Sequence, residues 1–247
     1  MPADFLLFVV IGFAAQLIDG AIGMAYGLAS STILLSMGVP PATASASVHT
    51  AEVFTTAASS ISHWRLGNVD KRLFRRLVIP GVIGGALGAY LLSAVPGETV
   101  RPFVGIYLGI MGFVILWRAF RRRYGAPTEP KQVEALGFAG GFLDAVGGGG
   151  WGPMVTSSLI GQGKNARLAI GSTNAAEFLV TLTISGTFVV TIGLELWPII
   201  LGLTLGGALA APIAAYVTRA LPDRPLMIIV GVIITLLSIR ELVRTLL

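Results

Sequence analysis

Four carboxylates lie within apolar stretches of the sequence, and they are the residues most able to do chemistry: Asp19, Glu52, Asp144 and Glu177. An ionisable group at membrane depth is costly unless it faces a polar cavity, so such residues mark ion or substrate pathways by default. We expect all four to take part in proton coupling. For the two aspartates, a second reading stays open, in which they only cap short helices by accepting hydrogen bonds from free backbone N–H groups.

Hydrogen-bonding side chains surround the two glutamates. His49 and Asn174 each precede a glutamate by three residues, so on a helix each pair shares one face. Histidine has a reference pKa near physiological pH, so His49 could take up or pass a proton, although a packing role is equally open. Hydrogen bonds between helices are the alternative role for the neighbouring polar side chains. We expect the following to bind substrate: Ser47, Ser172, Thr173 and Asn174.

Glycine-rich stretches follow the two aspartates, at 19–23 and 144–150. Glycine costs a helix about 1 kcal/mol relative to alanine, so these stretches predict helix breaks. A helix that restarts after a break presents free N–H donors and a partial positive charge, which attract anions. Close packing of helices is the alternative role for these glycines, and core filling for the aromatics. The expected anion-binding residues are Gly23, Gly148 and Gly149, with Tyr26 and Trp151 closing over the substrate.

Membrane helices are the elements that must position these residues. The chain has 247 residues, of which 54% are hydrophobic and 12% charged, with a mean hydropathy of +0.83. Soluble domains carry about 25% charged residues, so a soluble globule, a disordered chain and a nucleic-acid-binding module are all excluded. There is no cysteine, and no nucleophile triad or metal-ligand spacing has supporting context. We therefore expect no enzyme activity, no metal and no cofactor.

Apolar runs divide the chain into eight segments: 5–37, 41–63, 73–94, 99–118, 133–161, 166–192, 196–218 and 225–246. The first and fifth are too long for one crossing, since a helix rises about 1.5 Å per residue and the apolar slab is about 30 Å thick. Both contain a glycine-rich stretch. We expect each to form two short helices joined inside the membrane, which gives an all-α integral membrane protein of up to ten helices.

The chain is an internal duplication at an offset of 125 residues, which becomes 126 after one inserted residue. The offset pairs Asp19 with Asp144 and Glu52 with Glu177, and later Gly81 with Gly207. The expected divisions are a first transmembrane repeat at 1–118, a basic cytoplasmic linker at 119–132 and a second repeat at 133–247.

Basic residues are enriched in cytoplasmic loops, and their distribution predicts how the repeats are related. If each long segment enters and returns on one side, 14 Lys and Arg residues lie inside and 3 outside; eight simple crossings give 12 and 5. The first arrangement fits better. It makes the two four-segment repeats inverted in topology, as in many secondary transporters, with both termini outside.

The repeated motifs resemble the sulfite exporter TauE/SafE family of anion permeases. The resemblance rests on paired Gly-Phe-Ala-x-x-x-x-Asp-x-x-x-Gly blocks at 12–23 and 137–148, on the run 147–153, and on Gly171-Ser172-Thr173-Asn174. It covers nearly the whole chain. It implies a multi-pass protein of the bacterial inner membrane that moves a small sulfur-containing or carboxylated anion, such as sulfite, a sulfonate or a sulfoacid.

The residues suggest a mechanism for such a protein. An anion between the two glycine breaks would lie near carboxylates, which is tolerable only if they are protonated or paired with a cation. We therefore expect proton-linked transport by alternating access, with the anion, protons and lipid as partners and no nucleic acid. Two alternatives stay open: a cation transporter that uses the carboxylates directly, and a channel-like or scaffolding protein with structural carboxylates. The sequence leaves open whether the protein is a homodimer.

Overall fold

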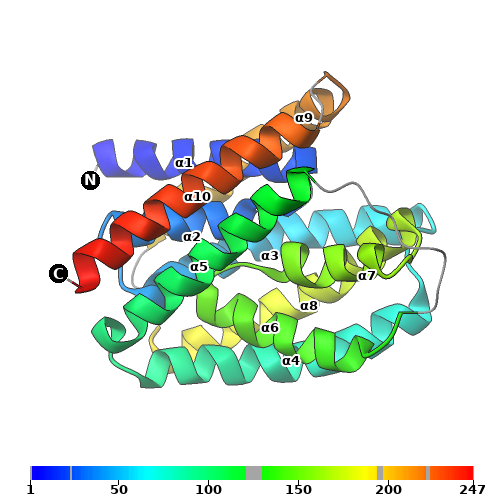
Figure 1. Ribbon diagram of the computed structural model, residues 1–247, viewed down its shortest axis with the longest axis horizontal. Coiled ribbons are helices and arrows are strands. Elements are labelled where there is room, and N and C mark those ends of the chain that lie inside the picture. The colour runs from blue at the N-terminus through cyan, green and yellow to red at the C-terminus, as the bar shows by residue number, and fades with distance from the viewer. Residues whose placement is uncertain (1, 23, 121–129, 194–196, 221–222, 247) are drawn as a thin grey trace.

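The computed structural model describes residues 2–22, 24–120, 130–193, 197–220 and 223–246, and over these ranges it contains helices and no strand (Figure 1). The first half contains α1 (Pro2–Ile22), α2 (Tyr26–Ser36), α3 (Pro41–Arg65), α4 (Lys71–Ala94) and α5 (Gly97–Phe120). The second contains α6 (Val133–Gly147), the short π-helix η1 (Gly152–Thr156), α7 (Ser157–Gly161), α8 (Ala166–Thr191), α9 (Trp197–Ala220) and α10 (Asp223–Leu246). Most of the expected linker 119–132 lies outside the described residues.

The helices follow the apolar segments of the sequence. Each of the six shorter segments is one helix, and each long segment is interrupted where glycines occur: α1 ends at Ile22 and α2 begins at Tyr26, while α6 ends at Gly147. In the second break Gly148, Gly149 and Gly150 have φ angles of 70°, 150° and 142°. These values suit glycine and strain other residues, so glycine is required at this break.

The second interrupted segment folds back as a hairpin. The Lys131 N–H, just before α6, donates to Oε1 of Gln162, just after α7, at 2.8 Å. On the same end of the bundle Lys164 pairs with Asp70, and the Arg224 guanidinium lies 5.0 Å from the Phe120 ring centre. We call this the basic end; it includes the loops at 66–70 and 162–165, the end of α5 and the start of α10.

The first interrupted segment folds back at the other end of the bundle, which we call the far end. The last carbonyls of α2 accept hydrogen bonds there from Arg101, early in α5, and Arg244, late in α10. α1 runs alongside α9 in the same direction, because Gly202 of α9 lies against Phe8 and Gly206 against Val9. Figure 1 shows both chain termini at this end. The two hairpins therefore enter the bundle from opposite ends.

Equivalent helices of the two halves form equivalent pairs, and each pair joins one half to the other. α1 packs along α9 and α6 along α4, while α5 pairs with α10 and α3 with α8. Small residues permit these close approaches, as membrane helices commonly require. Gly141 of α6, for example, lies directly against the carbonyl of Gly81 in α4.

Three of the described helices are long and apolar enough to cross a membrane: Lys71–Ala94, Gly97–Phe120 and Ala166–Thr191. Phe5–Asp19 and Trp197–Ala210 are shorter apolar stretches. Large apolar side chains are exposed along the outward face of α5, including Phe103, Ile106, Ile110 and Phe113. A soluble monomer rarely exposes such a stripe, whereas a lipid-facing helix does.

Candidate functional site

A cavity of about 500 Å³ lies between the two helix breaks and the central pair α3 and α8. All four carboxylates singled out in the sequence line it: Asp19, Glu52, Asp144 and Glu177. The polar lining also includes Gln16, Tyr26, Thr55, Thr56, Ser59, His63 and Asn174. Among the described lining residues there is no Lys or Arg, so the cavity carries acidic groups without a permanent positive charge to offset them.

The cavity extends toward the basic end. On α3 its lining runs from Glu52 through Thr56 and Ser59 to His63, at spacings of four, three and four residues that form one helix face. On α8 it runs from Glu177 back to Ile170. α3 and α8 are antiparallel, since the Asp70 N–H that follows α3 donates to a hydroxyl in the second turn of α8 at 2.9 Å. Both rows of lining residues therefore lead to the same end of the bundle.

Each aspartate bridges its helix break through one carboxylate oxygen. Asp19 Oδ1 accepts hydrogen bonds from the N–H groups of Ala25, at 2.7 Å, and Tyr26, at 3.2 Å. Asp144 Oδ1 accepts from the N–H of Trp151 at 2.9 Å. Tyr26 and Trp151 are equivalent in the duplication, so the cap has the same geometry in both halves. These caps occupy backbone donors that the sequence suggested for an anion.

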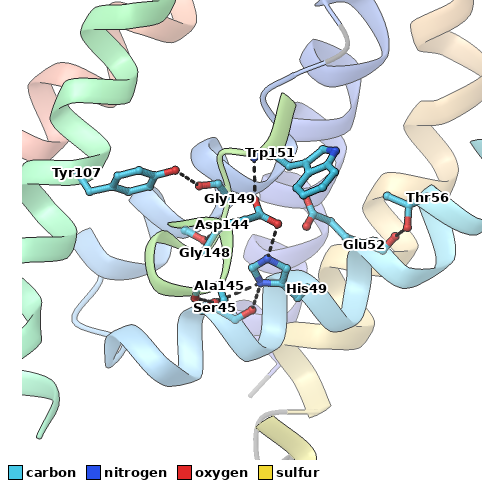
Figure 2. Close-up of polar contacts among 11 residues, drawn as sticks. Ser45, His49, Glu52, Thr56, Tyr107, Asp144, Ala145, Gly148, Gly149 and Trp151 are labelled. Atoms are coloured by element: carbon cyan, nitrogen blue, oxygen red, sulfur yellow. Dashed lines mark hydrogen bonds and ion pairs between the residues drawn. The ribbon is translucent and has the colours of Figure 1, made fainter. Parts of the chain in front are cut away.

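The second oxygen of Asp144 contacts His49, which is fully buried in α3. His49 Nε2 lies 3.2 Å from Asp144 Oδ2, and Nδ1 lies 2.8 Å from the carbonyl oxygen of Ser45 (Figure 2). The carbonyl can only accept, and the Ser45 hydroxyl proton is donated to the carbonyl of Ala145 at 2.6 Å, so Nδ1 must carry hydrogen. Nε2 and Oδ2 face each other at hydrogen-bonding distance, and this contact joins α3 to the second break.

Hydroxyl groups attach the second break to three helices around this contact. Ser31 of α2 donates to the Gly148 carbonyl at 2.5 Å, and Tyr107 of α5 donates to the Gly149 carbonyl at 3.0 Å. The Ser45–Ala145 bond from α3 is the third. Figure 2 shows Ser45, His49 and Tyr107 around the Asp144 segment. These contacts hold the second break against α2, α3 and α5.

The two glutamates reach the cavity from the central helices. Glu52 is 8% exposed, and its carboxylate lies against the first turn of α2, where a Cβ added to Gly27 would be 3.0 Å from Oε1. Glu177 is half-buried on α8. One turn before Glu177, the Asn174 amide oxygen accepts a hydrogen bond from Ser59 of α3 at 2.8 Å, which links the two helices across the cavity.

Two of the expected substrate contacts, Tyr26 and Asn174, line the cavity, and the others have different surroundings. Ser172 accepts from the Asp70 N–H at the basic end and donates to the Leu168 carbonyl at 2.6 Å. Thr173 Oγ1 accepts from the Thr156 hydroxyl at 2.9 Å. Their role in substrate binding stays a prediction.

Five more expected contacts are placed away from the cavity or not described. Ser47 and Trp151 are buried outside the lining, and the indole N–H of Trp151 donates to a backbone carbonyl of α8 at 3.2 Å. Gly148 packs against α2 and α3, and Gly149 packs against the start of α2. Gly23 lies outside the described residues. Of the expected proton-coupling groups, the carboxylates line the cavity, and His49 lies behind Asp144.

Sequence reasoning missed the polar face of α3 beyond Glu52. Thr56, Ser59 and His63 continue that face, and Thr55 lies beside it. The signal was present as polar residues at helical spacing after a buried glutamate. Gln16, one turn before Asp19, was also missed and lines the cavity from α1.

Comparison with known proteins identifies relatives over nearly the whole chain. "Probable membrane transporter protein YtnM" of Bacillus subtilis (strain 168) is 41% identical over 248 residues, which cover 96% of this chain and 82% of that protein. "Probable membrane transporter protein YdhB" of the same organism is 25% identical over 228 residues, covering 88% and 89%. No solved structure matches significantly. The family model for sulfite exporter TauE/SafE matches residues 8–241, and the chain therefore belongs to the sulfite exporter TauE/SafE family of membrane transporters.

Proposed function

We propose that this membrane transporter is a proton-linked secondary carrier of a small sulfur-containing anion, such as sulfite, a sulfonate or a sulfoacid, in the bacterial inner membrane. The observation that carries the proposal is the cavity, which is lined by four carboxylates and whose lining on α3 and α8 runs toward the basic end. The family's description as sulfite exporters supports the sulfur chemistry. The two Bacillus relatives support transport in general, since their names state no substrate.

The acidic lining supports a proton link. Charges interact strongly in a cavity of low dielectric constant, and no Lys or Arg is present among the described lining residues to offset an anion. An anion can share the cavity with Glu52 and Glu177 only when these are protonated, so its entry would favour proton uptake. His49 also lies 3.2 Å from Asp144 at the wall of the same cavity, and an imidazole can pass a proton. Transport of the anion would therefore move protons with it.

Alternating access by inverted repeats is supported by the placement of the two hairpins. They enter the bundle from opposite ends, and reciprocal helix pairs surround them. Among the described residues, the basic side chains at the far end are Arg101, Arg240 and Arg244, and the basic end carries charged loops. By the charge rule, we expect the basic end to lie in the cytoplasm. The structure would then represent an inward-open state.

The test compares net transport with exchange in proteoliposomes. In a carrier with Glu52→Gln or Glu177→Gln, we expect sulfite uptake driven by a pH gradient to be lost, because the neutral side chain no longer releases a proton. Exchange of sulfite across the membrane should persist, since it needs no net proton movement. Glu98→Gln is the matched control, because Glu98 is an exposed residue at the far end and lies outside this cavity. Full gradient-driven uptake by both variants would contradict the proton link.

Two other functions have different signatures in the same preparation. The acidic lining itself favours a cation carrier, although the described residues contain no cluster of three or more His, Asp or Glu side chains that could hold a metal ion. Stabilisation by sodium or a divalent cation, with none by any anion, would support it. A scaffold with structural carboxylates predicts instead that both glutamine variants lose folded protein.

A further inference from the structure

We propose that the His49–Asp144 contact is a latch that keeps the far end closed, and that Asn174 and Asp19 form the counterpart latch when the basic end closes. The proposal builds on alternating access in the proposed function and assigns the contacts that hold each state. It starts from the duplication, in which His49 is equivalent to Asn174, and Asp144 to Asp19.

The two aspartates have equivalent hydrogen-bond partners at Oδ1 and different surroundings at the second carboxylate oxygen. Oδ1 of each caps its helix break, with an N–H of Tyr26 or Trp151 as donor. Oδ2 of Asp144 is bound to His49, whereas Asp19 and Asn174 both line the open cavity. The Asn174 amide nitrogen has a second hydrogen to donate besides the one bound to the Ile170 carbonyl. Asn174 could therefore donate a hydrogen bond to Asp19, and the open cavity between the two side chains prevents that bond.

Packing around the two equivalent aromatics shows the same asymmetry. A Cβ added to Gly81 would lie 2.9 Å from the Trp151 ring and 2.9 Å from Val180, so α4, α8 and the second break are in tight contact. At the equivalent Gly207 a Cβ would lie 3.6 Å from the Tyr26 ring, which is ordinary spacing. The side that contains the His49–Asp144 latch is therefore closed, and its counterpart is loosely packed.

Two buried hydroxyls on α8 indicate that the closed side opens. Thr181 is equivalent to Thr56, which lines the cavity, and Ser185 lies one turn further on. Both are buried, and the hydroxyl oxygen of each has no hydrogen-bond partner among the described residues. Such groups cost free energy and call for an explanation. A state in which this face of α8 lines an opposite cavity would hydrate both hydroxyls.

Cysteine labelling can test the latch without a substrate or a proton gradient, and the chain has no native cysteine to interfere. Thr56→Cys reports on the basic-end cavity and Thr181→Cys on the closed side. In detergent, a maleimide should label the first quickly and the second slowly. Adding His49→Ala should raise the ratio of Thr181→Cys to Thr56→Cys labelling by about tenfold or more, since the buried contact that joins α3 to the second break is lost.

Two further variants separate a latch from general loosening of the fold. Asn174→Ala, combined with His49→Ala, should return the labelling ratio toward its original value, because the competing latch is then also lost. His49→Gln, whose amide nitrogen can replace Nε2, should keep the original ratio. Unchanged protection of Thr181→Cys in His49→Ala would overturn the proposal, and so would failure of Asn174→Ala to reverse the shift. Loss of transport with these labelling results intact would instead count against the proposed function.

Discussion

The close approach of the two helix breaks at Gly27 gives a prediction whose size can be worked out. A Cβ added to Gly27 would lie 2.8 Å from the Cα of Gly149 and 3.0 Å from the carbonyl oxygen of Gly148. Both neighbours are backbone atoms of glycines with positive φ, so a side-chain rotation cannot relieve the overlap. Gly27→Ala should therefore force the two breaks apart.

The matched control is Gly186→Ala. Gly186 lies within α8, and a Cβ added there would meet no atom within 4 Å. Alanine improves helix propensity by about 1 kcal/mol at an interior position. Overpacking in a well-packed site costs about 1–3 kcal/mol. Only Gly27→Ala introduces a steric overlap with backbone atoms. We therefore expect Gly27→Ala to be less stable than Gly186→Ala by about 1–3 kcal/mol.

Thermal unfolding in detergent is the assay. At roughly 2–4 °C per kcal/mol for a chain of this size, the midpoint of Gly27→Ala should lie about 2–12 °C below that of Gly186→Ala. Because Gly27 also contacts the Glu52 carboxylate, proton-driven uptake should fall in Gly27→Ala more than exchange does. Equal midpoints for the two variants would refute the close approach of the breaks.

Two ion pairs lead to further predictions. The hydrogen bond from Lys164 holds the pKa of Asp70, in the loop before α4, below its ordinary value, so this pair contributes stability above pH 4 or so and loses it as pH falls through the lowered pKa. The unsubstituted protein should have a higher thermal midpoint than Asp70→Asn, by at most about 1 kcal/mol in stability because the pair is partly exposed. In a pH series this difference should vanish below the lowered pKa of Asp70. Arg101→Gln would leave the buried Glu241 without its partner and should cost up to about 3–5 kcal/mol in thermal unfolding. Arg76→Gln is the control, since the carboxylate partner of Arg76 is more than half exposed, and a similar loss there would contradict the argument.

Element positions could be predicted from the sequence because their causes are local. Apolar runs of membrane length produced the helices, and the glycines after Asp19 and Asp144 produced the breaks, as helix propensity dictates. The four carboxylates could also be chosen in advance, since burial of a charge in an apolar stretch is costly wherever the helices pack. All four line the cavity.

The partners of each polar group were decided by tertiary structure. Asp144 caps its own break and also reaches His49, which lies 95 residues away, and no local pattern shows that contact. The same applies to Ser172, whose hydroxyl is bound to the loop before α4 rather than exposed in the cavity. Hydrogen-bonding capacity can be read from residue type, whereas the partner depends on which segments meet.

The open end of the cavity is the clearest case that the sequence alone could not determine. The two repeats have equivalent residues at Thr56 and Thr181, so the sequence is compatible with a cavity beside either one. Tight packing of α8 against α4 buries Thr181, and looser packing of α3 toward α9 leaves Thr56 in the cavity lining. A duplicated chain specifies two related arrangements, and only the packed structure shows which of them is adopted.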